Sequence, residues 1–334
     1  MVTVTPGTST VLLGNSLQFV AQLANTTNTR VTWSVNGVPG GNNATGTISA
    51  DGIYVSPSDL PANTSVQITA TSAADTTKSG SAKVTLASDI SLLLTPGTAN
   101  VELGAVQKLQ LRLSSSSRPD MKILWTVSGA ACPGACGSVD ANGNYTAPSI
   151  LPFSASVVVN AQSVADPSKT ASAALNITSN FLLQLAAPTS TGIGSTVAVV
   201  ATLTPIPNSN PNSALNWSVT GSGCSGSSCG SIVPATTQFD ANNVVVSSAN
   251  YAAPIAAPTP NAVIITVTPT ADPAKKAQAP IAVQQSAGIS ISPNTAALAA
   301  NHRVTFVVQL SGIQNANLNW SVNGIPGGSA TVGQ

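Results

Sequence analysis

The four cysteines are the residues of this chain whose chemistry is easiest to anticipate, because they form two local pairs. Cys132 and Cys136 enclose Pro-Gly-Ala, and Cys224 and Cys229 enclose Ser-Gly-Ser-Ser. Four cysteines allow three connectivities, and proximity favours pairing within each local pair. We therefore expect two structural disulfides, each holding one hairpin shut, and an oxidising compartment outside the cytoplasm.

Zinc binding and a redox switch are the alternatives for these cysteines. A zinc site would need the two pairs to converge, and neither pair has the usual Cys-x-x-Cys spacing. A redox switch would need a basic neighbour to activate a thiolate, and neither pair has one nearby in the sequence. We expect no metal site and no cofactor.

Other residue combinations that could support catalysis lack the context they need. The segment from Gly221 to Gly226 matches a dinucleotide-binding pattern of glycines, but it lies in a predicted hairpin with no helix behind it. His302 is the single histidine, and no acid lies near it in the sequence to complete a Ser-His-Asp triad. The ten acidic residues are scattered, most of them in predicted turns. We expect no catalytic residues and no enzyme.

The elements that position the cysteines belong to a repeat built around tryptophan. Each tryptophan stands in a similar segment, the first of which reads Val-Thr-Trp-Ser-Val. The tryptophans are Trp33, Trp125, Trp217 and Trp320, at intervals of 92, 92 and 103 residues. This period is close to the length of one β-sandwich domain, so the tryptophans are expected to mark successive cores.

Alternating apolar residues predict the strands of each core. In the first copy Leu17, Phe19, Ala21 and Leu23 occupy every second position and so face one side of a strand. The tryptophan segment supplies the facing wall. No helical period appears, which indicates an all-β chain of tandem sandwiches, three complete and one partial.

Two further signals recur in the complete copies. One is Tyr-x-x-Pro, preceded by Gly-x in two copies, with Tyr54, Tyr145 and Tyr251. The other is Ala-Asp-x-x-Lys, where the aspartate is expected to bond the backbone of its own turn. The predicted domains are 1–87, 88–178, 179–285 with a hairpin insertion near 234–248, and the partial copy 286–334.

At these residues the chain resembles the bacterial immunoglobulin-like repeats of the Big-2 group, found in tandem in adhesins and other surface proteins. The resemblance rests on the tryptophan segment, the Gly-x-Tyr-x-x-Pro segment and the Ala-Asp-x-x-Lys turn. It implies an immunoglobulin-like sandwich and an extracellular or cell-surface setting, but no ligand. The chain departs from antibody domains because its cysteines do not flank the tryptophan strand.

The composition also argues against nucleic acid and membranes as partners of this chain. Charged residues make up 6% of the chain and the net charge is +1, so there is no basic face for nucleic acid. No run of eighteen apolar residues is present to span a membrane, and Met1 to Pro6 do not resemble a secretion signal.

These features favour a non-catalytic extracellular stalk, spacer or filament subunit. The alternative is an adhesin or glycan-binding module that uses loops of the third copy, where Phe239 is the aromatic residue of the insertion. The partial copy 286–334 would leave Phe306 and Trp320 facing half a core. It is explained either as an excerpt of a longer array or by a neighbouring copy that completes it by strand addition.

Overall fold

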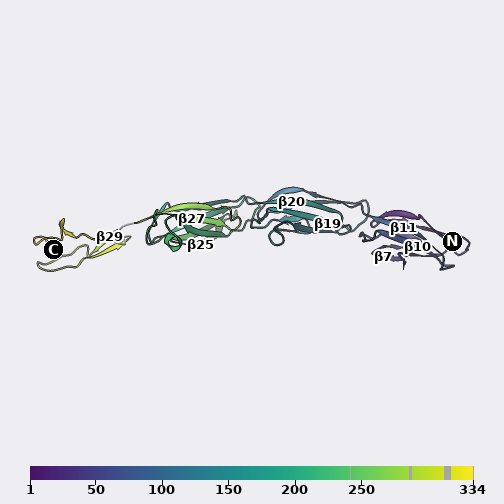
Figure 1. The fold of residues 1–334 in the computed structure, drawn as a ribbon, viewed down its shortest axis with the longest axis horizontal. Coiled ribbons are helices and arrows are strands. Elements are labelled where there is room, and N and C mark those ends of the chain that lie inside the picture. The colour runs from purple at the N-terminus through teal and green to yellow at the C-terminus, as the bar shows by residue number, and fades with distance from the viewer. Residues whose placement is uncertain (241, 286–287, 312–316, 334) are drawn as a thin grey trace. The chain divides into compact units, whose positions relative to one another are not determined.

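The computed structural model describes residues 1–240, 242–285, 288–311 and 317–333, whose regular secondary structure is almost entirely β-strand (Figure 1). The chain divides into two compact units. The first unit comprises Met1–Ser179 and Asn208–Pro211, and the second comprises Asn180–Pro207 and Asn212–Gln334. Below, repeats 1, 2 and 3 denote the predicted domains 1–87, 88–178 and 179–285. These boundaries remain predictions.

Repeat 1 is a sandwich of two facing sheets. One has the strand order β2-β11-β10-β5-β6, and the other is built from β1-β4 and β3-β9-β8-β7. Strand β2 runs parallel to β11, and the other pairs are antiparallel. The strands are β1 (Val2–Thr5), β2 (Thr8–Leu12), β3 (Ser16–Gln18), β4 (Val20–Leu23), β5 (Val31–Val35), β6 (Val38–Pro39), β7 (Gly41–Asn42), β8 (Gly46–Ile48), β9 (Ile53–Val55), β10 (Ser65–Ser72) and β11 (Ser79–Ala87).

Repeat 2 has the same topology, with one sheet in the order β13-β20-β19-β16 and the other split into β12-β15 and β14-β18-β17. As β2 does with β11, the second strand of this repeat, β13, runs parallel to the last strand, β20. The strands are β12 (Ser91–Thr95), β13 (Thr98–Glu102), β14 (Val106–Lys108), β15 (Gln110–Ser114), β16 (Ile123–Ser128), β17 (Ser138–Val139), β18 (Asn144–Thr146), β19 (Ser156–Ser163) and β20 (Thr170–Thr178).

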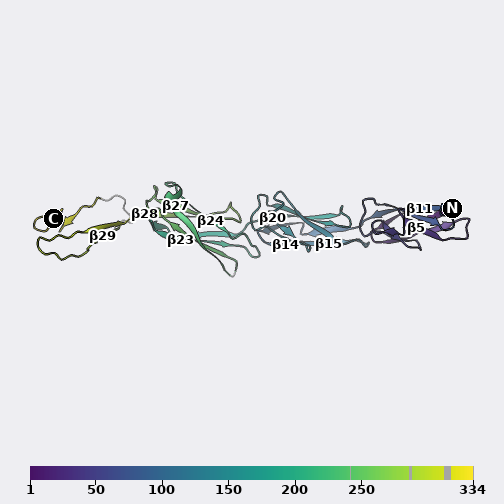
Figure 2. The same cartoon turned by 90° about the horizontal axis from the view of Figure 1, so that it is seen from below.

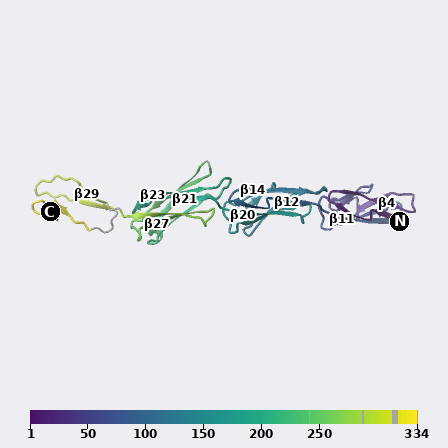
Figure 3. The same cartoon turned by 90° about the horizontal axis from the view of Figure 1, so that it is seen from above.

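Repeat 3 forms two complete four-stranded sheets, β22-β28-β27-β24 and β21-β23-β26-β25. Strands β23, β24, β27 and β28 are seen together in Figure 2. In Figure 3, β21 lies beside β23 in one sheet, and β27, of the other sheet, lies opposite them. The elements are β21 (Leu182–Ala186), β22 (Ser190–Gly192), β23 (Thr196–Thr204), β24 (Leu215–Thr220), the 3₁₀ turn η1 (Gly226–Cys229), β25 (Ser231–Phe239), β26 (Val245–Ala252), β27 (Ala262–Pro269) and β28 (Ala277–Gln284). The chain therefore consists of tandem immunoglobulin-like sandwiches.

The core of repeat 1 follows the predicted alternation. Phe19 is fully buried, and Leu17, Ala21 and Leu23 pack against the same cluster. Trp33, on β5, is 5% exposed in that cluster. In the other sandwiches Leu109 and Val199 take the place of Phe19, while Trp125 on β16 and Trp217 on β24 are partly buried.

The strand predicted over residues 17–23 is interrupted at Phe19. Phe19 N donates to Gly52 O at 2.8 Å, and the strand changes neighbours there, from β9 beside β3 to β1 beside β4. Repeat 2 repeats the break, with Leu109 N bonded to Gly143 O at 2.9 Å. In repeat 3 the corresponding strand, β23, is continuous.

The partial copy contributes β29 (Gly288–Ser292), β30 (Val307–Ser311), β31 (Ser321–Val322) and β32 (Ile325–Pro326). These form two separate pairs, β29 with β30 and β31 with β32. Trp320 lies just before β31 and is 47% exposed, so the residue that marks the core elsewhere is only half covered here.

Candidate functional site

The cysteines form two disulfides, Cys132–Cys136 after β16 and Cys224–Cys229 after β24. Each bond therefore closes one hairpin, and the two occupy equivalent places in repeats 2 and 3. The second cysteine of each pair is buried. Cys224 sits within the core cluster of repeat 3 together with Cys229.

A buried tyrosine anchors each of these hairpins. The Tyr145 hydroxyl donates to the carbonyl oxygen of Cys136 at 2.8 Å, and Tyr251 does the same to Cys229 at 2.8 Å. In repeat 1, which has no cysteine, Tyr54 donates to Thr45 O at 2.7 Å. Burial raises the pKa of Tyr145 to about 12, so the phenol remains a donor at physiological pH.

The glycine that precedes the tyrosine in two copies has a steric role. Gly52 adopts φ +81°, and a Cβ there would lie 3.0 Å from the Trp33 ring and 2.4 Å from Phe19 O. A Cβ at Gly143 would likewise lie 3.0 Å from the Trp125 ring. The recurring tryptophan, glycine and tyrosine are thus parts of one packing unit, which their shared spacing could have indicated.

In the Ala-Asp-x-x-Lys turns of repeats 1 and 2, the aspartate accepts a hydrogen bond from the backbone of its own turn. Asp75 Oδ1 accepts from the backbone N of Thr77 at 2.9 Å, and Asp166 Oδ1 accepts from Ser168 N at 3.0 Å. The two turns differ in burial, because Asp166 is 3% exposed whereas Asp75 is exposed. The turn of repeat 2 therefore has a second role, in packing, which the turn pattern did not indicate.

That second role is at the junction between repeats 1 and 2, within the first unit. Leu13, Ile90 and Ala165 form a buried apolar cluster. Three main-chain hydrogen bonds surround it, from Leu60 N to Ala165 O at 2.7 Å, from Arg118 N to Leu13 O at 3.1 Å, and from Asp120 N to Ser58 O at 3.0 Å. Consecutive sandwiches here share a packed interface as well as a linker.

At this junction Gly14 lies against the loop that contains Arg118, and we call this close approach the glycine corner. Gly14 has φ +69°, its N donates to Pro57 O at 2.9 Å, and a Cβ there would lie 2.0 Å from Arg118 O. The same arrangement recurs at Gly104, where a Cβ would lie 2.1 Å from Asn210 O. Asn210, in the part of the first unit numbered 208–211, also donates its N to Leu103 O at 2.9 Å.

The linker residue Asp89 is held by three serines of the loop before β16. The hydroxyls of Ser115, Ser116 and Ser117 and the backbone N of Ser116 reach its carboxylate at 2.5–2.6 Å. These bonds, the one from Ser115 foremost, lower the pKa of Asp89 well below its ordinary value. The carboxylate is therefore ionised in neutral solution, and it holds the loop from which Arg118 N and Asp120 N bond to repeat 1.

The predicted insertion of repeat 3 lies mostly in strands. Gly137 and Asp140 of repeat 2 are three residues apart, whereas the equivalent Gly230 and Asp240 are ten apart, so the hairpin has kept its turn and lengthened its arms. In both repeats the aspartate carboxylate accepts backbone N–H groups of the turn. The added part of β26 pairs with Val200–Leu203, which makes the sheet continuous where repeats 1 and 2 have it split.

The hairpin extension exposes its outer strand. Val245 and Ser247 on β26 are buried, but β25 is exposed over most of its length and Phe239 is 61% exposed. The aromatic residue singled out by the sequence is thus accessible, although it belongs to a strand end and not to a loop.

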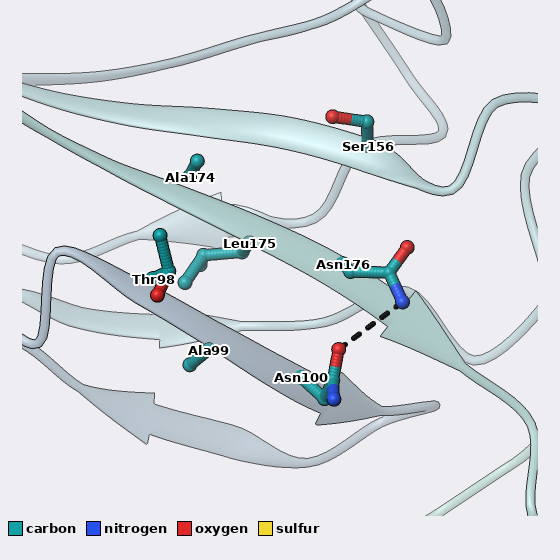
Figure 4. A pocket seen from close by; sticks show the side chains of 7 residues that line it. All are labelled: Thr98, Ala99, Asn100, Ser156, Ala174, Leu175 and Asn176. Carbon is teal, nitrogen blue, oxygen red and sulfur yellow. Dashed lines mark hydrogen bonds between the residues drawn. The ribbon is translucent and has the colours of Figure 1, made fainter.

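An open hollow of about 450 Å³ lies on the β13-β20-β19-β16 sheet of repeat 2 (Figure 4). Thr98, Asn100, Ser156 and Asn176 line it with hydroxyl and amide groups, and Asn176 Nδ2 donates to Asn100 Oδ1 at 3.2 Å. None of its lining residues is charged.

Among the residues that the structure describes, no three His, Cys, Asp or Glu side chains gather so as to hold a metal ion. The glycine pattern at 221–226 runs only into the four-residue turn η1. None of the described residues forms a helix with the length and apolarity that a membrane crossing requires.

No family model and no curated protein matches the chain. Among solved structures it is similar to FdeC, an Escherichia coli adhesin, with 15% identity, a TM-score of 0.35, and 84% of this chain and 96% of that chain covered. It is also similar to the N-terminal eight Ig domains of Down Syndrome Cell Adhesion Molecule, with 12% identity, a TM-score of 0.28 and coverages of 83% and 40%. These likenesses concern the fold, and no argument about function rests on them.

Proposed function

We propose that the chain is a non-catalytic extracellular structural protein, a stalk, spacer or filament subunit of Big-2-like domains. The observation that carries this proposal is the junction of repeats 1 and 2, where an apolar cluster and three main-chain bonds join consecutive sandwiches. A spacer needs such junctions because a linker alone would leave its domains free to reorient. The two hairpin disulfides are typical of proteins in an oxidising, extracellular compartment.

NMR relaxation of the whole chain tests the spacer. If the junction holds, the amides of repeats 1 and 2 share one rotational diffusion tensor. Leu60→Asp, which places a charge against Ala165, is expected to separate their tumbling, and Asp59→Asn on the neighbouring residue is the control. Independent tumbling of the two repeats in the wild-type protein would remove the support for a spacer.

Self-association through the partial copy is the second part of the proposal. Phe306, Leu318 and Trp320 are exposed in 288–333, although their counterparts in repeat 1 lie in the core. Covering such side chains stabilises by about 1.5–3 kcal/mol each, so strands of another copy would find a favourable surface here. Trp320→Ser is expected to weaken self-association in sedimentation experiments, while Trp125→Phe in repeat 2 should leave it unchanged.

An adhesive or glycan-binding role is the second candidate, and the exposed Phe239 on the extended hairpin favours it. Deleting residues 234–248 would remove the buried Val245 and Ser247, so a point change is the cleaner test. Phe239→Ala should abolish binding to a glycan array or to cell surfaces if this role holds. Phe153→Ala, at a residue 85% exposed in repeat 2, is the matched control.

A further inference from the structure

The outer edge of β25 is unusual among the repeats. Within the described residues β25 pairs only with β26, so one side of its nine-residue backbone is open. The equivalent edges of repeats 1 and 2 are kept to the two- and three-residue strands β7, β8 and β17. Short edges limit pairing with other chains, and repeat 3 departs from that rule.

Half of this edge is protected and half is not. The pairing register with β26 shifts between Pro234 and Thr236, and Pro234 has no N–H to offer. Beyond that bulge, Thr236–Phe239 pairs with β26 in unbroken register. No charged residue occurs in Ser231–Phe239, and charges are the usual means of keeping an edge apart from another.

The direction of the backbone groups follows from the hairpin. Asp240 N donates to Val244 O at 3.1 Å, and Thr236 N donates to the hydroxyl of Ser248 at 3.3 Å, so both groups face β26. The N–H and C=O groups of successive residues alternate sides along a strand. The backbone groups of Gln238 therefore also face β26, whereas those of Thr237 and Phe239 point to the open edge. The Thr237 hydroxyl bonds to that of Ser247 on β26 at 3.2 Å, and so does not cover this edge.

We propose that this edge, Thr236–Phe239, pairs antiparallel with the same edge of a second copy of the chain. Two identical edges related by a two-fold axis are self-complementary, and the result is one continuous sheet through β26, β25 and the partner's equivalent strands. With a net charge of +1 on the whole chain, long-range repulsion between copies is small. This lateral contact is separate from the function proposed above and uses none of the residues 286–334.

Sedimentation equilibrium tests the pairing directly. A four-residue edge buries little surface, so a dimer is expected only in the upper part of a range from about 10 µM to about 1 mM. Thr237→Pro removes an N–H on the open edge and none that faces β26. In the Trp320→Ser protein, where association through the partial copy is weakened, it should abolish the dimer. Thr237→Ala keeps that N–H and should dimerise as the wild type does.

Hydrogen exchange provides the second readout. The amides of Thr237 and Phe239 should exchange about tenfold more slowly, or slower still, in the concentrated sample than in the dilute one, while Gln238 stays protected in both. Loss of Gln238 protection would reveal that Thr237→Pro opens the hairpin. In that case Thr237→Lys is the test variant, and it should weaken association by charge repulsion. The proposal is overturned if the wild type stays monomeric throughout, or if, in the Trp320→Ser background, the folded variant of position 237 associates as strongly as the protein with Thr237 in place.

Discussion

The hydroxyl of Tyr145 donates a hydrogen bond to the carbonyl oxygen of Cys136, which ties the disulfide hairpin of repeat 2 to the buried core. The pair is nine residues apart, as are Tyr54 and Thr45, but Tyr251 and Cys229 are 22 apart. Lengthening the hairpin of repeat 3 has therefore left its anchor unchanged. The hairpin could grow because its base is held independently of its tip.

Removing this anchor should destabilise repeat 2 locally. Tyr145→Phe leaves the Cys136 carbonyl without its donor in a buried site, at a cost of about 1–3 kcal/mol. The expected result is faster hydrogen exchange in Val157–Ala161, with the exchange of repeat 1 unchanged. Tyr54→Phe is the matched control and should give the opposite distribution. Equal exchange in wild type and variant would show that the bond contributes nothing.

The disulfides should stabilise only modestly, because each closes a very short loop. On the chain-entropy argument the replacement of Cys132 and Cys136 by serine costs about 2 kcal/mol, confined to repeat 2. The unreduced, denatured protein should show no free thiol in a thiol titration. Repeat 1, whose hairpin contains no cysteine, serves as the internal control in reductant. A large loss of stability in repeat 1 on reduction would contradict this account.

Gly14→Ala should loosen the junction of repeats 1 and 2. An L-residue at φ +69° costs about 1 kcal/mol in strain, and its Cβ would collide with Arg118 O as well. Gly194→Ala separates the two effects, since Gly194 has φ +65° but no described atom within 4 Å of the added Cβ. Both variants should lose stability, and only the first should uncouple repeats 1 and 2 in NMR relaxation. Coupling that survives Gly14→Ala would contradict the role assigned to the glycine corner.

The Asp89 interaction should be insensitive to pH near neutrality. The folded pKa of Asp89 is lowered, so its contribution is complete above the unfolded pKa of about 4 and is lost as pH falls through the folded value. The Ser116 amide shift should therefore stay flat from pH 5 to 8 and move only in stronger acid. Asp89→Asn should loosen the junction at every pH. A transition of that amide between pH 5 and 7 would be inconsistent with this assignment.

The repeating core was readable from the sequence because its signals are local. Alternation placed Phe19 in the core, and the recurring tryptophan predicted the sandwich, since both depend on strand geometry alone. The junction was not readable, because Leu60 and Ala165 lie 105 residues apart, and the hydrogen bond that joins them runs between backbone atoms and does not depend on residue type. The sequence predicts a hairpin insertion near 234–248 and a binding surface on the loops of repeat 3. The inward alternation of Val245, Ser247 and Ala249 could have indicated how much of it is strand.

The contacts that fix repeat 2 against repeat 1 run largely between main-chain atoms, from Leu60 to Ala165, Arg118 to Leu13 and Asp120 to Ser58. Such contacts constrain side chains only at the glycine corner and the few apolar positions of the cluster. The exposed side chains around them can therefore change in evolution without altering the alignment of the two domains. A protein built in this way can vary its surface residues while keeping the spacing of these two domains constant.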